Sequence, residues 1–465
     1  MTKKHKKQSL VRGISPFPLM HTAVTAGVIF LAAVHLGGFT NFPIAHGAET
    51  LPIAGQPATQ RVVPYQPEEA RSVVVTRETF QTMDGFGVSA AWVAGHLYDS
   101  LDEPARQFVL DMLFTEAGTN LSIVRIKIEP DIAARGHDPG QEFLITQAQQ
   151  RGVTRFLATP WTPPAEWEDE DNRLKLEHYQ DYAQFLVDYV KLYREKGIWI
   201  SWLSLQNEPD LSVEYESCVW TQQQFCFFVP LLRETLDASG LTDVQLIGPD
   251  AMGWSHAYEY IEHLIESEAH NAVDVWTTHG YWGEENNEAL NPYRESIRDL
   301  ADQYAKKVWL TEWSDLKTLW YGDPNDRNVV GIEDGLMWAE RIITDLTVAN
   351  VSAWFYWWIY NPNPVEFPTT PNEGLMIRTP EDTFILPKRF HTFSHFSRFI
   401  RPGAQRVAVV GGPPHLSIVA FGSPDQQQLN VTVVNRTNQA TLLNLDFADY
   451  LFYGNAQVYR TSETE

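Results

Sequence analysis

Two glutamates stand at the ends of two similar apolar stretches. Residues 198–205 are mostly apolar, too short for a typical helix and rich in strand formers, and Asn207, Glu208 and Pro209 follow them. Because proline cannot continue a central strand, this strand must stop where Glu208 lies. Residues 307–312 repeat the pattern and end at Glu312. A carboxylate at the carboxyl end of a parallel strand is a typical place for a catalyst, although such a glutamate can equally cap the next helix.

A pair of carboxylates at one barrel mouth suits glycoside hydrolysis. One protonates the leaving oxygen, while the other attacks the anomeric carbon or activates water, and a separation of about 5–5.5 Å predicts retention of configuration. Asn207, beside the first glutamate, could bind a sugar 2-hydroxyl. Glu129, Asp131 and Asp250 also follow expected strands, and spacing alone does not exclude them.

The elements that must position these groups recur along the chain. Apolar, strand-like runs alternate with helical stretches, and their number and spacing predict an α/β fold, a (β/α)8 TIM barrel. The expected strands are 83–90, 121–128, 155–159, 198–206, 244–248, 273–279, 307–312 and 351–357. In this count Glu208 ends the fourth strand and Glu312 the seventh.

A second domain is expected beside the barrel. After Pro402 the pattern changes to short alternating runs separated by turn residues, which predicts a β-sheet module. Residues 71–82 are strand-like and precede the barrel, so both chain ends are expected to build one β-sandwich side domain. The predicted organisation is a signal peptide over 1–48, a linker over 49–70, N-terminal strands over 71–82, the catalytic barrel over 83–400 and the C-terminal sandwich over 401–465.

Composition restricts the partners. The net charge of −24 disfavours nucleic acid and anionic membranes, because phosphate contacts need clustered Lys and Arg. A neutral oligo- or polysaccharide fits this charge better. The 16 Trp and 18 Tyr are compatible with sugar stacking as well as with core packing. We expect a monomer.

The first 48 residues have the order of a secretory signal peptide. A basic start at 3–7 is followed by an apolar run over 23–39 and by small residues near Ala48. We therefore expect a secreted, extracellular protein without a membrane association after cleavage, with a retained anchor as the alternative. Cys218 and Cys226 are candidates for a disulfide, since a secreted chain with two cysteines invites one.

Four motifs in this order resemble glycoside hydrolase family 30, in clan A of the retaining glycosidases. The likeness runs from about residue 72 to 460. The motifs are Asp84-Gly85-Phe86-Gly87, Thr159-Pro160-Trp161-Thr162-Pro163-Pro164-Ala165-Glu166-Trp167, Leu205-Gln206-Asn207-Glu208-Pro209-Asp210 and Ser394-His395-Phe396-Ser397-Arg398-Phe399-Ile400-Arg401-Pro402-Gly403.

The resemblance implies roles for single residues. Glu208 would be the general acid/base and Glu312 the nucleophile. Arg125, at the end of the second strand, would lie near the nucleophile, and Asn207 would bind the 2-hydroxyl. No metal and no organic cofactor would be needed.

Further positions match the sugar-binding surface of the family. His279 and Tyr281 match an active-site His-x-Tyr, in which the tyrosine could bond with the nucleophile. Three tryptophans match aromatic positions of the binding floor, although packing in the core would explain each of them as well: Trp161, Trp167 and Trp357.

The resemblance leaves the substrate open. The family includes xylanases, endo-β-1,6-glucanases, β-1,6-galactanases, exo-acting glycosidases and glucosylceramidases. The motifs over 84–92 and 215–220 favour endo-acting xylan degradation. Arg378 and Lys388, in or beside the proline-rich stretch 361–387, could meet an acidic side group, but solvated loop cations explain them more simply. A non-catalytic carbohydrate-binding protein is the alternative of another class.

Overall fold

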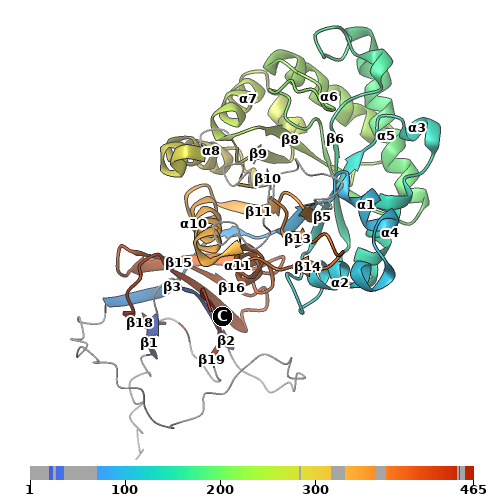
Figure 1. The fold of residues 1–465 in the computed structure, drawn as a ribbon. Coiled ribbons are helices and arrows are strands. Elements are labelled where there is room, and N and C mark those ends of the chain that lie inside the picture. The colour runs from blue at the N-terminus through green and yellow to red at the C-terminus, as the bar shows by residue number, and fades with distance from the viewer. Residues whose placement is uncertain are drawn as a thin grey trace, which may run out of the picture.

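The computed structural model describes residues 20–24, 28–35, 71–281, 284–315, 330–361, 373–447, 450 and 456–464. These residues form a closed barrel and a separate sheet-rich side domain (Figure 1). No helix in these ranges is long and apolar enough to cross a membrane.

Eight parallel strands close the barrel, as the sequence predicts. They run around it in the order β10, β11, β4, β5, β6, β7, β8 and β9. Their bounds are β4 Gly85–Ser89, β5 Ile123–Ile128, β6 Arg155–Pro160, β7 Ile200–Ser204, β8 Gln245–Ala251, β9 Val275–His279, β10 Lys307–Glu312 and β11 Val351–Tyr356.

The barrel interior is a packed apolar core. Its side chains come from most of the strands, so each strand is buried on both faces and reads as a continuous apolar run. The cluster consists of Ile123, Leu157, Trp202, Ile247, Val275, Trp309, Ala353 and Phe355. Packing of this kind fixes the positions at which the strands end. The polar residues at these strand ends are therefore held in fixed positions as well.

Helices cover the outside of the barrel (Figure 1). Their starts follow ordinary capping rules; for example, Thr221 and Gln224 form a capping box at the start of α6. The α-helices are α1 Val93–Asp99, α2 Glu103–Phe114, α3 Ile132–Arg135, α4 Pro139–Gln150, α5 Tyr179–Glu195, α6 Gln222–Ala238, α7 Trp254–Glu266, α8 Asn291–Gln303, α10 Ile332–Val348 and α11 Lys388–Ser397. Short 3-10 helices are η1 Ala165–Trp167, η2 Leu176–His178, η3 Ala269–Ala272 and η4 Glu284–Leu290.

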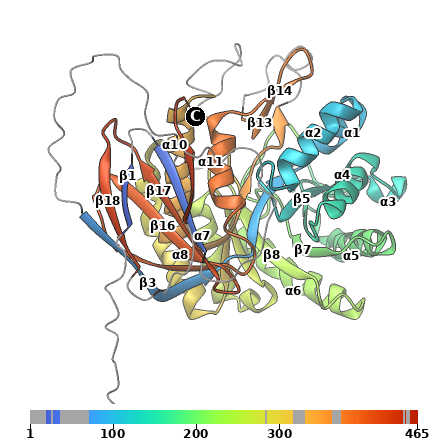
Figure 2. The same cartoon turned by 90° about the horizontal axis from the view of Figure 1, so that it is seen from below.

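The side domain is built from both chain ends. Its eight-stranded sheet has the order β1, β18, β3, β15, β16, β17, β2 and β19, and helices α10 and α11 pack against it (Figure 2). The strands are β1 Met20–Val24, β2 Val28–His35, β3 Arg71–Thr82, β15 Gln405–Gly411, β16 Leu416–Gly422, β17 Gln428–Asn435, β18 Thr441–Asp446 and β19 Ala456–Thr461. The expected pairing of residues 71–82 with the C-terminal strands is present, because β3 lies between β15 and β18.

Two of these strands come from the segment predicted to be a signal peptide. β2 pairs antiparallel with β17 on one side and with β19 on the other. Cleavage near Ala48 stays a prediction, and it would remove both β1 and β2 from this sheet. The predicted linker over 49–70 lies outside the described residues.

A small three-stranded sheet follows the last barrel strand. It consists of β12 Tyr360–Asn361, β13 Met376–Arg378 and β14 Phe384–Ile385. Arg378 is buried within it and donates to Asp382 Oδ1 at 2.9 Å and to the Ser100 carbonyl at 3.0 Å. The solvated loop cation expected here is therefore a buried structural arginine.

Candidate active site

The chain places Glu208 four residues beyond β7 and fixes it through its backbone. The amide of Asn207 donates to the Pro160 carbonyl of β6 at 2.9 Å, and the amide of Glu208 donates to the Asp250 carbonyl of β8 at 3.0 Å. Glu208 adopts a left-handed backbone conformation with φ 44°. Such conformations cost free energy in non-glycine residues and cluster at functional sites. Bonds to both neighbouring strands hold Glu208 in this conformation.

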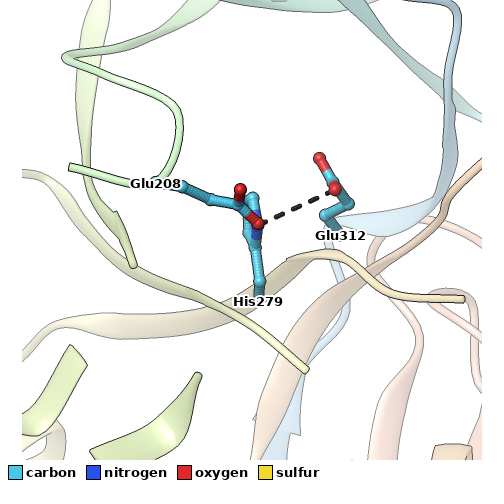
Figure 3. A group of neighbouring side chains, drawn as sticks. All are labelled: Glu208, His279 and Glu312. Atoms are coloured by element: carbon cyan, nitrogen blue, oxygen red, sulfur yellow. Dashed lines mark hydrogen bonds and ion pairs between the residues drawn. The ribbon is translucent and has the colours of Figure 1, made fainter. Parts of the chain in front are cut away.

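Glu312 is the last residue of β10, and its side chain faces Glu208 across the barrel mouth (Figure 3). One oxygen of each carboxyl group and a ring nitrogen of His279 lie within 4.8 Å of one another. This spacing agrees with the separation of about 5–5.5 Å that retaining glycosidases use, and it leaves no room for an inverting water between the two groups.

Glu312 is held as a hydrogen-bond acceptor. Arg125 Nη1, from β5, donates to Oε2 of Glu312, and Tyr281 Oη donates to Oε1 at 2.9 Å. Burial raises the pKa of Glu312, while His279 and the Arg125 guanidinium act in the opposite direction. A directly bonded guanidinium favours the ionised carboxylate that a nucleophile needs. The predicted hydrogen bond between Tyr281 and Glu312 is confirmed.

Glu208 has a different environment, which favours its protonated form. Its pKa is raised to about 8, chiefly by burial, with the negative charges of Asp210 and Asp250 contributing to the rise and the charge of Arg125 opposing it. His279 Nδ1 lies 3.0 Å from Oε1, and burial lowers the pKa of this histidine, so the imidazole is neutral at pH 7. A carboxyl group that stays protonated at neutral pH suits a general acid.

Asn207 is oriented by the same arginine. Arg125 Nη2 donates to Asn207 Oδ1 at 2.6 Å, which leaves the Asn207 amide N–H groups to donate to a ligand. Arg125 Nε donates to Thr159 Oγ1 at 3.2 Å, and its guanidinium lies 4.7 Å from the centroid of the Trp161 ring. One buried arginine therefore positions both the predicted nucleophile and the predicted 2-hydroxyl ligand.

A cavity of about 410 Å³ opens above these groups. Three tryptophans pack edge-on or tilted along its wall, with ring centroids 5.3–6.2 Å apart, and such aromatic surfaces suit the C–H faces of sugar rings. The cavity is lined by Trp92, Trp161, Asn207, Glu208, Tyr215, Met252, Tyr281, Glu312, Trp357, Trp358 and Glu373. A wider hollow of about 940 Å³ lies at the N-terminal ends of the strands, away from both glutamates.

Most residues predicted for the site are brought together there, but Trp167 is not. Its ring stacks on His178 at a centroid distance of 5.6 Å and packs edge-on against Phe185. The prediction that Trp167 binds substrate is not supported, because the turn at Ala165–Trp167 carries it towards helix α5. Trp161, six residues earlier at the end of β6, does line the cavity.

The alternative carboxylates have structural roles. Glu129 accepts from Lys127 Nζ at 2.7 Å, and Asp131 pairs with Arg135 on the surface. Asp250 is fully buried behind Glu208, where it accepts hydrogen bonds from Ser204 and from Thr311. It therefore supports the site without facing the cavity.

The candidate disulfide is absent. Cys218 and Cys226 are buried free thiols, which corrects the prediction. Cys218 lies in the loop before α6 and interacts with Glu168, whereas Cys226 points from α6 towards Ser267. The two side chains face different neighbours, so closure would require a rearrangement of the loop.

Five lining residues were not predicted as site residues. Trp92 lies three residues after the end of β4 and could have been found by the rule that identified the glutamates, since Glu208 too lies a few residues beyond its strand. The others lie in loops whose course the sequence pattern does not specify: Tyr215, Met252, Trp358 and Glu373.

The donor atoms of Glu208, His279 and Glu312 are close enough together to be considered as metal ligands. Arg125 weighs against this use, because its guanidinium already bonds with Glu312 and a second cation there would be repelled. The arrangement therefore suits proton transfer and nucleophilic attack better than metal binding.

A TIM barrel with two facing glutamates at the ends of its fourth and seventh strands, one favouring its protonated form and the other bonded with an arginine, is the arrangement that glycoside hydrolases use. Comparison with known proteins agrees. A model of O-glycosyl hydrolase family 30 matches residues 134–365. The chain belongs to glycoside hydrolase family 30.

Individual relatives are similar at low identity. A glucuronoxylanase XynC of Bacillus subtilis is 23% identical over 61% of this chain and 60% of its own length, so the match spans about three fifths of that relative. The lysosomal acid glucosylceramidase of Mus musculus is 22% identical over 80% of this chain and 78% of its own. The catalytic domain of a family 30 xylanase C from Talaromyces cellulolyticus superposes with a TM-score of 0.64 and 27% identity, over 78% of this chain and 86% of that one.

Proposed function

We propose that this protein is a secreted, retaining β-glycoside hydrolase that cleaves xylan internally by double displacement. The observation that carries the proposal is the facing pair Glu208 and Glu312, whose carboxyl oxygens come within 4.8 Å and whose environments differ in the way the two roles require.

The first step forms a covalent intermediate. The Glu312 carboxylate attacks the anomeric carbon and forms an ester bond, while the glycosidic C–O bond breaks and Glu208 gives its proton to the leaving oxygen. Asn207 can donate from its amide to the 2-hydroxyl, and Arg125 keeps Glu312 ionised until attack.

The second step releases the sugar. Glu208, now a carboxylate, takes a proton from water, and the resulting hydroxide attacks the anomeric carbon and displaces Glu312. Two inversions give net retention. His279 holds one oxygen of Glu208 at 3.0 Å, so the same carboxyl group can give and then take the proton without moving far.

A second substrate class has support of its own. The relative named a lysosomal acid glucosylceramidase aligns over 80% of this chain, more than the 61% covered by the relative named a glucuronoxylanase. An exo-acting β-glucosidase or glucosylceramidase activity is therefore the second candidate. An endo-β-1,6-glucanase or galactanase activity is supported by family membership alone.

A product screen tests the proposal. Xylan, glucuronoxylan, β-1,6-glucan, arabinogalactan, glucosylceramide and aryl β-glycosides are incubated with the protein, and products are identified by chromatography and by NMR of the anomeric proton. Short β-configured xylo-oligosaccharides are expected. Binding to a polymer without release of reducing sugar would instead indicate a carbohydrate-binding protein.

Secretion is tested separately by N-terminal sequencing of the protein from the culture medium. A start near Glu49 supports a cleaved signal peptide. A start before residue 20 contradicts cleavage, and it would agree with a role of residues 20–35 as strands β1 and β2.

A further inference from the structure

A third carboxyl group faces the cavity beside the two catalytic ones. Glu373 lies on the stretch that leads into β13, and it lines the cavity together with Glu312 and Trp357. The double-displacement mechanism gives it no role. A buried carboxyl group in this position is therefore available for a role other than acid, base or nucleophile.

The backbone around Glu373 is firmly held. Tyr356 Oη donates to the Glu373 carbonyl at 3.2 Å, and Arg389 Nε donates to the Gly374 carbonyl at 2.9 Å. The Gly374 amide donates to Asn361 Oδ1 at 2.5 Å. A Cβ atom at Gly374 would come within 2.5 Å of the Asn361 backbone nitrogen, so only glycine fits there. Glu373 is thus presented to the cavity from a fixed support.

The carboxyl group of Glu373 is held by a buried serine that follows Glu312 closely in the sequence. Ser314 Oγ, fully buried two residues after Glu312, donates to Glu373 Oε2 at 2.7 Å. The pKa of Glu373 is raised to about 7, chiefly by burial, with the charge of Glu312 contributing to the rise. Bonds with Ser314 and Trp357 and the positive charge of Arg389 oppose it. No lysine or arginine among the described residues forms an ion pair with it.

A carboxylate in such a place is costly unless a ligand supplies donors. Sugar hydroxyl groups are such donors. Three carboxyl groups line the cavity, and none of its lining residues among those the structure describes is a lysine or an arginine. An anionic sugar would therefore meet these carboxyl groups, while the charge of Arg125 is already engaged by Glu312. The wall around Glu373 therefore suits neutral sugars and disfavours acidic ones.

We propose that Glu373 is a specificity-determining residue that accepts hydrogen bonds from the hydroxyl groups of a neutral sugar and excludes sugars that carry a carboxylate from the cavity. This inference rests on the proposed function only in taking the cavity as a sugar site. The substrate class that Glu373 would select is an unsubstituted neutral β-glycan, rather than a glycan with a uronic acid group beside Glu373.

The experiment measures binding without turnover. In a Glu312→Gln background, methyl β-xyloside, methyl β-glucoside and methyl β-glucuronide are titrated while the fluorescence of the cavity tryptophans is followed. The glucoside and the glucuronide differ only in a hydroxymethyl group against a carboxylate. The same titrations are made after adding Glu373→Gln, and after adding the control Glu340→Gln.

Glu340 is a suitable control because it is a partly buried carboxyl whose pKa is also raised by burial, but it bonds with Ser417 of the side domain and lies outside the cavity. Circular dichroism checks that each variant is folded. A repeat of the titrations between pH 6 and 8.5 reports the ionisation of Glu373.

We expect the Glu312→Gln protein to bind a neutral glycoside at least tenfold more tightly than the glucuronide at pH 8. Glu373→Gln should weaken neutral binding roughly tenfold, since a hydrogen bond to a charged acceptor is lost, and should reduce the preference over the glucuronide. Glu340→Gln should change neither. The pH dependence of neutral binding near pH 7 should disappear in Glu373→Gln.

Equal binding of the glucoside and the glucuronide, unchanged affinities in Glu373→Gln, or no binding of any neutral glycoside would overturn the inference. Its failure is distinguishable from failure of the proposed function. If the wild type hydrolyses a glycoside but Glu373→Gln binds sugars as before, only the inference about Glu373 is contradicted. If the binding pattern is as expected but the wild type hydrolyses nothing, only the proposed enzymatic function is contradicted.

Discussion

Arg125, on strand β5, reaches across the barrel mouth and donates a hydrogen bond to the carboxylate of Glu312, the last residue of β10. Both side chains are buried, so the charge of the arginine acts on Glu312 with little screening by solvent. The pair explains how a carboxyl whose pKa is raised by burial can still serve as a nucleophile.

Replacement of Arg125 should move the acidic side of the pH–rate profile. In Arg125→Ala the pKa of Glu312 rises further, because the opposing charge is lost, so kcat/KM should start to fall at a higher pH than in the wild type. We also expect kcat to drop roughly 100-fold or more, as for the removal of other buried electrostatic contacts. An unchanged acidic limb, measured from pH 3 to 7, would contradict this role.

The alkaline side should respond to Asp210. Burial and the negative charge of Asp210 together raise the pKa of Glu208 to about 8, and Glu208 must be protonated to act as an acid. In Asp210→Asn the pKa of Glu208 should fall, so activity should be lost at a lower pH than in the wild type. The aspartate also accepts from the Met252 amide and from His256, so melting temperatures are compared first. A shift of the alkaline limb to higher pH would refute the argument.

Stability should also reveal the burial of Glu208. Its folded pKa of about 8 lies above its unfolded value, so the folded state binds the extra proton between roughly pH 4.5 and 8, and stability decreases as pH rises through that window. Glu208→Gln removes this effect. The variant should melt higher than the wild type at pH 8, by up to a few kcal/mol of unfolding free energy, and not at pH 4. Equal melting curves at pH 8 would mean that Glu208 is not buried in this way.

The two tryptophans predicted for the binding floor should behave differently. Trp161 lines the cavity beneath Arg125, whereas Trp167 packs on His178 outside it. Trp161→Ala should raise KM roughly tenfold. Trp167→Ala should lower the melting temperature and leave KM unchanged. If Trp167→Ala raised KM as much as Trp161→Ala does, Trp167 would have to contact the substrate, which would contradict this distinction.

The sequence predicted those parts of the site that depend on regular structure. Apolar runs that end in polar residues located all eight barrel strands, and therefore Glu208 and Glu312, because the carboxyl ends of parallel strands converge. Arg125, the third residue of β5, and His279 were expected in the site only from the family resemblance. Residues carried by irregular segments escaped it. Glu373 is held at the cavity by bonds from Tyr356 to its own carbonyl and from Arg389 to the carbonyl of Gly374, and such contacts between distant segments leave no periodic pattern.

The two site predictions that the structure does not support have the same origin. Trp167 lies one short turn beyond the motif that correctly located Trp161, and that turn redirects its side chain towards α5. Cys218 and Cys226 are close in sequence, but the loop before α6 turns the first thiol towards Glu168. The spacing of these residues in the sequence therefore does not determine where the Trp167 ring or the Cys218 thiol points.

The central claim is that Glu312 is the nucleophile of a retaining glycosidase. It is tested most directly by the turnover of Glu312→Ala on a substrate of the wild type, with and without azide. We predict that the variant alone is inactive, and that azide restores turnover and gives a glycosyl azide of inverted configuration, because the small anion occupies the place of the lost carboxylate. Wild-type-like activity of Glu312→Ala without azide would contradict the account.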